Sequence, residues 1–216
     1  MSGQTVKVTE PCVYLIDDDP VAKFLLADLV ESVHLPHRSF ESASSFLKQD
    51  LSKLAGCIVA DIRMPGMSGL ELQDELCSRR IGLPIIFISA YPELPLVVSA
   101  MRKGALDFFQ KPFSPQQVLD RIQDGLRIDE ARQELEAKHR EISERMSYLT
   151  PRERQVLEGV FEGKVTKVIA SEMGISQRTA ETYRHLIMQK LHAKSTAELI
   201  RLTLEYMPVS AAGHSG

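Results

Sequence analysis

Short apolar runs alternate with longer stretches of helical periodicity over the first 125 residues. Each apolar run is followed by a polar turn and then by an amphipathic segment, which is the pattern of a parallel sheet covered by helices on both faces. The expected strands are residues 12–16, 37–40, 56–60, 84–89 and 106–109. The sequence therefore predicts an α/β fold with a doubly wound, five-stranded parallel sheet over residues 1–125.

A long polar helix is expected next, from Pro115 to about Ser147, because no proline interrupts this stretch after its first turn. Roughly 33 residues at 1.5 Å per residue give a length of about 50 Å. A 3-4 spacing joins Ile128, Ala131, Leu135, Lys138, Ile142, Arg145 and Leu149. This spacing suits a weak dimeric coiled coil, but a solvated helix that links two domains explains it equally well.

The last third of the chain carries the pattern of short helices. TPRE at 150–153 predicts a capping box with proline at the first helical position. The segment from Lys164 to Leu191 then reads as helix, glycine turn and helix, with Ser176 as the cap of the second helix. The expected buried stripe of that second helix is Ala180, Tyr183, Ile187 and Leu191. This is the spacing of an all-α helix-turn-helix domain.

Composition supports two modest globular domains, since 216 residues with 44% hydrophobic residues provide material for two cores. The formal charge of -3 divides into -4 for residues 1–125, -1 for 126–147 and +2 for 148–216, so the basic end favours a polyanionic partner. Neither a signal peptide nor a membrane span of roughly 18 apolar residues is recognisable. Cys12, Cys57 and Cys77 show no CxxC pairing and are expected to be buried thiols in a reducing cytoplasm.

Polar residues follow four of the five expected strands: Asp17 and Asp18, then Asp61, Ser89 and Lys111. Ligands of open parallel sheets bind outside the carboxyl ends of the strands, where these side chains converge. Any one of them alone could be a helix cap or a solvated surface residue. Together, three carboxylates, a lysine and a hydroxyl predict a cation site with a phosphate-sized position beside it.

The chemistry of these groups suits phosphoryl transfer. Mg²⁺, or Mn²⁺ in its place, prefers carboxylate oxygens, which Asp17, Asp18 and Asp61 offer, with the Asp17 and Asp18 pair left to hold the metal. Asp61 stands alone at its strand end and is the best candidate for a carboxylate nucleophile, with Lys111 offsetting the charge that accumulates. Asp19 is expected to cap the helix that begins near Pro20, and a cis Lys111-Pro112 bond would aim the ammonium inward.

The motifs DD, DxRMPGMSG, SA and KPF, each after a strand, resemble the receiver domain of bacterial two-component response regulators. The resemblance implies a flavodoxin-like fold in which Asp61 accepts a phosphoryl group from a sensor histidine kinase. It also implies that the Arg63 carbonyl joins the metal ligands, that Ser89 and Lys111 contact the phosphoryl oxygens, and that Ser89 and Phe108 form the switch. From the residues alone, Phe108 could equally be a core side chain. Ser89 stands where threonine is commoner, and YPELP at 91–95 replaces the usual turn.

The pattern LTPRE, KxIA, GISxRT, KL and KS over residues 149–195 resembles the LuxR-type, or GerE-type, DNA-binding domain, a four-helix unit. With the receiver, it resembles the FixJ/NarL subfamily of transcriptional regulators. The resemblance implies that Glu181, Thr182 and His185 face the bases of double-stranded promoter DNA. It places the cations nearer the phosphates: Lys164, Lys167, Arg178, Arg184 and Lys190. Glu181 departs from the cation that is common at its position, so no known operator sequence can be transferred.

The resulting hypothesis is a cytoplasmic response regulator, not an enzyme, that dimerises on phosphorylation, binds DNA and acts with RNA polymerase. Its expected bounds are 1–125 for the receiver, 126–147 for a helical linker, 148–208 for the DNA-binding domain and 209–216 for a flexible tail. Two alternatives are a haloacid-dehalogenase-like phosphatase with Asp17 as nucleophile and an adaptor whose last third binds protein. The phosphatase needs an acidic pair after the lysine strand, where KPFSPQQVLD offers only Asp120.

Overall fold

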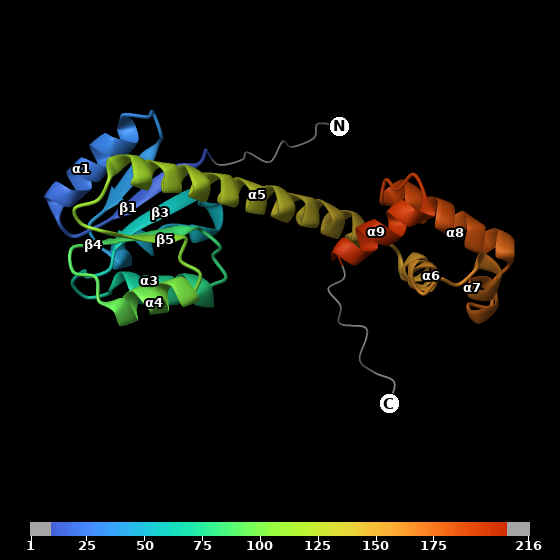
Figure 1. The fold of residues 1–216 in the computed structure, drawn as a ribbon. Helices are drawn as coiled ribbons and strands as arrows, with labels where there is room; N and C mark the ends of the chain where they lie inside the picture. Colours follow the sequence, from blue (N-terminus) through green and yellow to red (C-terminus); the bar gives the residue numbers. More distant parts are fainter. Residues whose placement is uncertain (1–9, 207–216) are drawn as a thin grey trace. The chain divides into compact units, whose positions relative to one another are not determined.

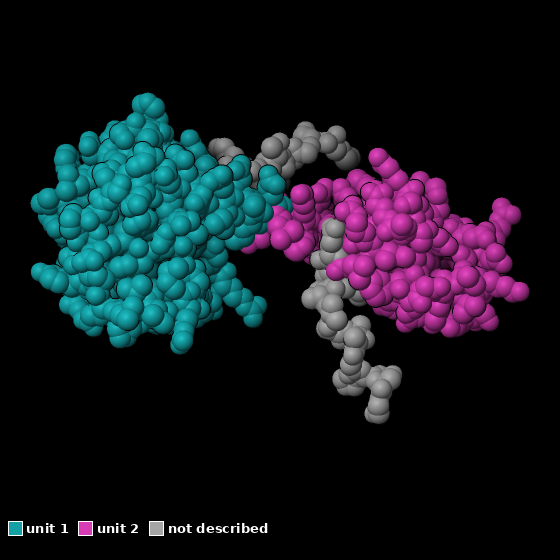
Figure 2. Space-filling model, viewed as in Figure 1, with its two compact units in different colours: residues 1–134 teal, residues 135–216 magenta. Residues whose placement is uncertain are grey.

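The computed structural model describes residues 10–206 and divides the chain into two compact units, 1–134 and 135–216 (Figure 2). The expected tail at 209–216 lies outside the described residues. The boundary between the units falls inside the stretch that the sequence assigned to a linker, residues 126–147. None of the helices described between residues 10 and 206 is long and apolar enough to cross a membrane.

The first unit holds the expected sheet, with all five strands parallel in the order β2-β1-β3-β4-β5. Its strands are β1 (Cys12–Ile16), β2 (His37–Phe40), β3 (Gly56–Asp61), β4 (Ile85–Ser89) and β5 (Asp107–Gln110). Its helices are α1 (Pro20–Glu31), α2 (Ala43–Phe46), the 3₁₀ turn η1 (Leu51–Lys53), α3 (Gly69–Ser78), α4 (Leu94–Arg102) and the first part of α5 (Pro115–Ser147). The predicted doubly wound α/β fold is confirmed.

Two hydrophobic cores cover the two faces of this sheet, because neighbouring residues of a strand point to opposite faces. Tyr14 and Ile16 pack in the core that contains Leu72 of α3. Val13 and Leu15 pack in the other core, which contains residues of α1 and α5. Figure 1 shows α1 and α5 on one side of the sheet and α3 and α4 on the other. The continuous apolar runs of β1, β3 and β4 follow from burial on both faces.

The second unit is all-α, as predicted, and contains α6 (Pro151–Phe161), α7 (Thr166–Glu172), α8 (Gln177–Lys190) and α9 (Thr196–Tyr206). The capping box at Thr150 and the Ser176 cap are both present. Ala180, Ile187 and Leu191 are buried, and Tyr183 packs against the core. The helix-turn-helix pattern was therefore read correctly, including its inward face.

The end of α5 belongs to the core of this second unit. Ile142 and Met146 are 7% and 5% exposed and pack with Leu149 among the residues of α6, α8 and α9. In contrast, Ile128 and Leu135 are 48% and 55% exposed. The residues of the 3-4 spacing therefore do not form one continuous surface available for a coiled coil, because the C-terminal members are already buried inside the second unit.

Two of the three cysteines were placed correctly. Cys12 and Cys57 are buried, and burial raises the pKa of both thiols. The expectation that Cys77 is also buried was wrong, because it lies near the end of α3 with its side chain exposed. The helix ends one residue later, at Ser78, and both Ser78 and Arg79 are exposed, so the Cys77 thiol lies at the edge of the face of α3 that packs against the core.

Candidate functional site

The polar side chains expected at one edge of the sheet are brought together there. Parallel pairing sets Ile16 beside Ala60, Asp61 beside Ile88, and Ser89 beside Gln110, so the carboxyl ends of four strands are level. Asp17 is 2% exposed, Asp61 8% and Ser89 2%. Partial burial makes the charges of this cluster interact more strongly than they would in water.

Lys111 connects the two buried carboxylates. Its Nζ lies 2.8 Å from Oδ2 of Asp17 and 3.2 Å from Oδ1 of Asp61. The Lys111-Pro112 peptide bond is cis, as expected, and the Lys111 amide donates to the Ser89 carbonyl at 2.8 Å. Residues 17, 61 and 111 thus meet across long separations in sequence.

The remaining carboxylate oxygens accept backbone hydrogen bonds. Asp17 Oδ1 accepts from the Asp19 amide at 2.9 Å, and Asp61 Oδ2 accepts from the Arg63 amide at 2.6 Å. Burial raises the pKa of Asp61 above its usual value, although Lys111 and the Arg63 amide oppose the shift. Burial alone would lower the pKa of Lys111, but hydrogen bonds and charges from Asp17 and Asp61 outweigh it, so the pKa is raised. Lys111 therefore remains an ammonium at neutral pH.

The expected metal ligands are of the right chemistry but are not arranged around one point. Asp17, Asp18 and Asp61 offer the hard oxygen ligands that Mg²⁺ prefers. Within residues 10–206, however, no three His, Cys, Asp or Glu side chains are grouped as a metal site. Asp18 is exposed, and the Lys111 ammonium bridges the other two carboxylates. The residues present fit such an ion once Lys111 gives up one of its two carboxylates.

The loop after Asp61 turns tightly, which fixes the position of this side chain. The Gly69 amide donates to the Ile62 carbonyl at 2.9 Å. A Cβ at Gly69 would lie 2.4 Å from the Asp61 carbonyl oxygen, so only glycine allows this approach. Gly66 has a φ of +83°, which also favours glycine. Both glycines therefore allow the tight loop that follows Asp61.

An ion pair across the mouth of the site was missed by the sequence analysis. Arg63, in the loop after β3, pairs with Glu93, the residue before α4. Both side chains are about half exposed, at 52% and 58%. The sequence did offer a signal for this pair, because Arg63 and Glu93 carry opposite charges and follow the neighbouring strands β3 and β4. Glu93 lies in YPELP, which the sequence analysis treated only as a departure from the family pattern.

The two expected switch residues differ in burial. Ser89 is buried at the end of β4, beside the site. Phe108 lies on β5, is half-buried and packs against the core on the α3 and α4 side. Its expected alternatives, a core residue and a switch residue, are both compatible with this position.

The exposed face of α8 carries half of the residues expected to meet DNA. Ser176 caps α8 and accepts from the Thr179 amide at 3.0 Å. The exposed members of the expected set are Lys167 on α7 and Arg178, Glu181, Thr182 and His185 on α8. Spacings of three and four residues place the α8 members on one side of that helix. Glu181 accepts from Gln177 Nε2 at 3.0 Å, which holds the carboxylate along the helix.

Three other expected DNA contacts have intramolecular partners. Lys164 pairs with Glu162 and Glu172 at 2.8 Å. Arg184 donates to two threonine hydroxyls, Thr166 at 3.0 Å and Thr196 at 2.6 Å. These contacts tie α7, α8 and α9 together.

Lys190, the last expected contact, lies 2.7 Å from Oε2 of Glu153, whose side chain is 3% exposed. Burial alone would raise the pKa of Glu153, but hydrogen bonds from Lys190 and Thr150 outweigh it and keep the pKa below its usual value. The same carboxylate closes the capping box of α6. Lys190 therefore has a structural task whether or not it reaches a phosphate.

Two family models match the chain. The model described as response regulator receiver domain matches residues 13–123, and the model described as bacterial regulatory proteins, luxR family, matches residues 147–203. The first span contains the cluster around Asp61, and the second contains α6, α7, α8 and most of α9. The two sites described above thus fall in separate, recognised domains.

Full-length relatives share both parts. Nodulation protein W of Bradyrhizobium diazoefficiens is 36% identical over 209 residues, which cover 97% of this chain and 92% of that protein. Transcriptional regulatory protein FixJ of the same organism is 38% identical over 91% of this chain and 96% of that protein. Among solved structures, the response regulator StyR is similar at 40% identity with a TM-score of 0.83, over 92% of this chain and all of that one. Full-length FixJ from B. japonicum is similar at 38% identity with a TM-score of 0.56, over 91% and 97%.

Proposed function

Because the chain belongs to the response regulator family, as a receiver domain joined to a LuxR-type DNA-binding domain, we propose that Asp61 is its phosphoacceptor. Its relatives are transcriptional regulators of two-component systems, and the chain is of this class and not a classical enzyme. The observation that carries the proposal is the Lys111 ammonium within 3.2 Å of both Asp17 and Asp61. A buried carboxylate beside a fixed cation suits attack on a phosphoryl group.

In the proposed reaction, an Asp61 carboxylate oxygen attacks the phosphorus of a phosphohistidine on a sensor histidine kinase. An O–P bond forms, the N–P bond breaks, and the imidazole nitrogen keeps the electron pair and takes up a proton. Lys111 offsets negative charge on the phosphoryl oxygens, and the Ser89 hydroxyl donates to one of them. The Arg63 amide, already 2.6 Å from Asp61, holds the carboxylate in place.

Receiver domains generally bind Mg²⁺ at the phosphorylation site. We propose Asp17, Asp18, Asp61 and the Arg63 carbonyl as the ligands here, with Mn²⁺ as a substitute. Such an ion would supply positive charge that offsets the negative charge of the phosphoryl oxygens. Before it binds, Lys111 neutralises part of the carboxylate charge.

We further propose that phosphorylation repositions Ser89 and Phe108 and favours a symmetric dimer. Direct backbone contact supports a coupling between the site and β5, since the Lys111 amide donates to the Ser89 carbonyl. A dimer brings two α8 helices to two half-sites, which raises affinity through linkage.

The DNA-binding unit is proposed to read double-stranded promoter DNA through α8, with Glu181, Thr182 and His185 at base edges and Lys164, Lys167, Arg178, Arg184 and Lys190 nearer phosphates. We retain 1–125, 126–147 and 148–208 as the proposed receiver, linker and DNA-binding domains. Contact with RNA polymerase and a location in the cytoplasm complete the proposal.

The test is incubation with acetyl phosphate and Mg²⁺, followed by intact mass and oligomeric state. Wild type should gain one phosphoryl group and shift towards dimer, whereas Asp61→Asn should do neither. Asp28→Asn, which changes an exposed carboxylate on α1, is the matched control and should behave as wild type. A phosphorylated Asp61→Asn protein would refute the assignment of the acceptor.

DNA binding is tested by selection from a random duplex library with and without the phosphodonor. Enrichment of a two-fold symmetric sequence only after phosphorylation is expected. Failure to retain any duplex at low salt would instead support a protein partner for the second unit.

A further inference from the structure

Among the described residues of the second unit, Glu153 is the one charged residue that is buried, at 3% exposed. It lies in the first turn of α6 and closes the capping box with Thr150. Burial alone would raise the pKa of Glu153, but hydrogen bonds from Lys190 and Thr150 lower it overall, so the carboxylate is charged at neutral pH. A capping box does not need this charge, because glutamine serves equally well at the same position. The buried charge therefore needs a second explanation.

The partner of this charge is Lys190, the last residue of α8. Its Nζ lies 2.7 Å from Oε2 of Glu153 and donates to the carbonyl of Tyr148 at 3.1 Å. Tyr148 is the first residue after α5. One ammonium group thus joins the C-terminal end of α8 to the start of α6 and to the end of α5.

Further contacts hold the same three helix ends together. Arg154 of α6 donates to the carbonyls of Met146 and Leu149 at 3.1 and 3.3 Å. Met146 and Leu149 also share a hydrophobic core with Ile187 and Leu191, at the C-terminal end of α8. The way in which α8 is held therefore depends on the end of α5 as well as on α6.

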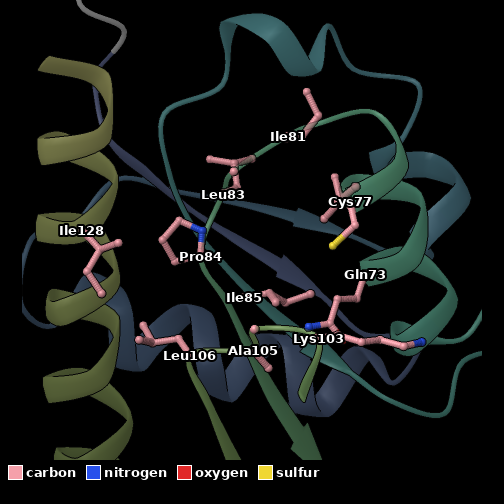
Figure 3. A pocket seen from close by; sticks show the side chains of 13 residues that line it. Gln73, Cys77, Ile81, Leu83, Pro84, Ile85, Lys103, Ala105, Leu106 and Ile128 are labelled. Atoms are coloured by element: carbon pink, nitrogen blue, oxygen red, sulfur yellow. The ribbon is translucent and has the colours of Figure 1, made fainter. Parts of the chain in front are cut away.

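An ion pair of the first unit provides the contrast. Lys103 lines the pocket between α3 and the start of β4 (Figure 3) and lies 2.6 Å from Asp74. Both side chains are more than a third exposed, and such pairs contribute little to holding helices in place. The carboxylate of Glu153 has lost its water instead, so the position of its cation is specified much more strictly.

We propose that Glu153 is a positioning residue for DNA binding, which holds Lys190 and thereby fixes α8 against the ends of α5 and α6. The inference rests on the proposed function of α8 in reading DNA. Because Glu153 is buried and negative, it does not itself meet the polyanion. It acts through α8, whose exposed face carries Glu181, Thr182 and His185.

The sign of the effect of Glu153→Gln separates this role from a simple charge effect. Glutamine keeps the size of the side chain and the capping box, but it removes the charge that holds Lys190. Loss of a negative charge and release of an ammonium group would by themselves strengthen binding to DNA. A positioning role predicts the opposite, an affinity about five- to tenfold lower.

Affinity is measured by fluorescence anisotropy, with the full chain, acetyl phosphate, Mg²⁺ and a labelled duplex obtained by the selection described above. Titration at duplex concentrations far above the Kd gives the fraction of each protein that is competent to bind, so weaker binding is separated from unfolding. Unchanged or tighter binding by Glu153→Gln would overturn the proposal. Glu158→Gln removes the same charge from an exposed position of α6 and should change the affinity by less than about twofold, because salt screens exposed charges.

A scrambled duplex provides a second readout. If α8 is displaced, Glu153→Gln should weaken binding to the selected duplex more than to the scrambled one, because base contacts depend more strictly on the placement of the helix than phosphate contacts do. An equal loss on both duplexes would indicate a general structural defect and would overturn the positioning role.

Lys190→Met tests whether Glu153 acts through Lys190. In this background, Glu153→Gln should no longer weaken binding to the selected duplex, because the partner of the carboxylate is already absent. Equal weakening in both backgrounds would overturn the proposed route. If wild type selects no duplex, the proposed DNA-binding function fails and the inference fails with it, whereas normal selection by wild type with no effect of Glu153→Gln refutes the inference alone.

Discussion

Replacing Lys111 by methionine should destabilise the first unit by about 3 kcal/mol, because two nearly buried carboxylates would lose their shared cation. At an effective dielectric constant of about 20, unit charges at the observed separations attract by roughly 6 kcal/mol for Asp17 and 5 kcal/mol for Asp61. The cost of desolvating all three groups offsets much of this attraction. Removing one member of a buried ion pair typically costs about 3–5 kcal/mol. Lys111 is still 24% exposed, which favours the lower end.

Hydrogen exchange of peptides from β1 and β3 measures this change within the first unit, without interference from unfolding of the second. A loss of about 3 kcal/mol corresponds to roughly 150-fold faster exchange of amides that exchange through global opening of the unit. The experiment is done without divalent ions, in which state Lys111 is the cation next to both carboxylates in the structure described here.

Lys103→Met is the matched control. Lys103 lies 2.6 Å from Asp74, an equally close contact, but its side chain is 37% exposed and that of Asp74 56%. Exposed pairs contribute about 0–1 kcal/mol, so exchange should change by less than about fivefold. Similar effects of the two substitutions would refute the argument that burial gives the Lys111 cluster its energy. Added Mg²⁺ should slow exchange more in Lys111→Met than in wild type, since no ammonium competes with the ion.

Three further outcomes are expected. Gly69→Ala should cost about 1–3 kcal/mol and slow phosphorylation from acetyl phosphate, because the new Cβ displaces the Asp61 backbone. Glu153→Gln should make the stability of the second unit less dependent on pH in the acid range. The lowered pKa of Glu153 stabilises the folded unit at pH values above 4.5, the usual pKa of the group, and this stabilisation is lost as the pH falls through the folded-state pKa. Thermal melts of wild type and variant at pH 3 to 6 measure the difference. Lys167→Ala should reduce the slope of log affinity against log salt by about 0.9 on any duplex, whereas Thr182→Ala should alter sequence preference, as filter binding would show.

Sequence patterns were sufficient to predict the five strands, several helix caps and the position of the candidate site around Asp61. Five short runs predicted all five strands to within one residue at each end. The central strands β1, β3 and β4 are buried on both faces and are therefore apolar up to their ends, whereas the edge strands β2 and β5 are partly exposed and carry polar residues. The parallel order of such strands then brings Asp17, Asp61, Ser89 and Lys111 to one edge of the sheet. The caps at Asp19, Thr150 and Ser176 are local hydrogen bonds that a few residues specify.

Contacts between distant polar residues outside the cluster around Asp61 were not predicted. Asp129 of α5 is 1% exposed and accepts from the Gly56 amide at 2.7 Å, at the start of β3. Lys190 was assigned to DNA by position, and its contact with Glu153 depends on how α6 and α8 pack. Which charged residues of a helix turn inward is decided by tertiary packing, and helical periodicity alone does not contain that information.

The charges around Asp61 bear on the proposal that this cluster holds a phosphoryl group reversibly. Asp17, Asp18 and Asp61 carry three negative charges against the single positive charge of Lys111, which leaves a net deficit of two. The proposed divalent cation would remove that deficit. Conversion of the Asp61 carboxylate into an acyl phosphate dianion then adds one negative charge, which has no new cation to meet it and must be spread over neutral donors such as Ser89 and backbone amides. In the proposed phosphorylated state, a closer approach of Ser89 would therefore stabilise the added charge. The unphosphorylated cluster carries no such charge, so loss of the phosphoryl group would release Ser89 again.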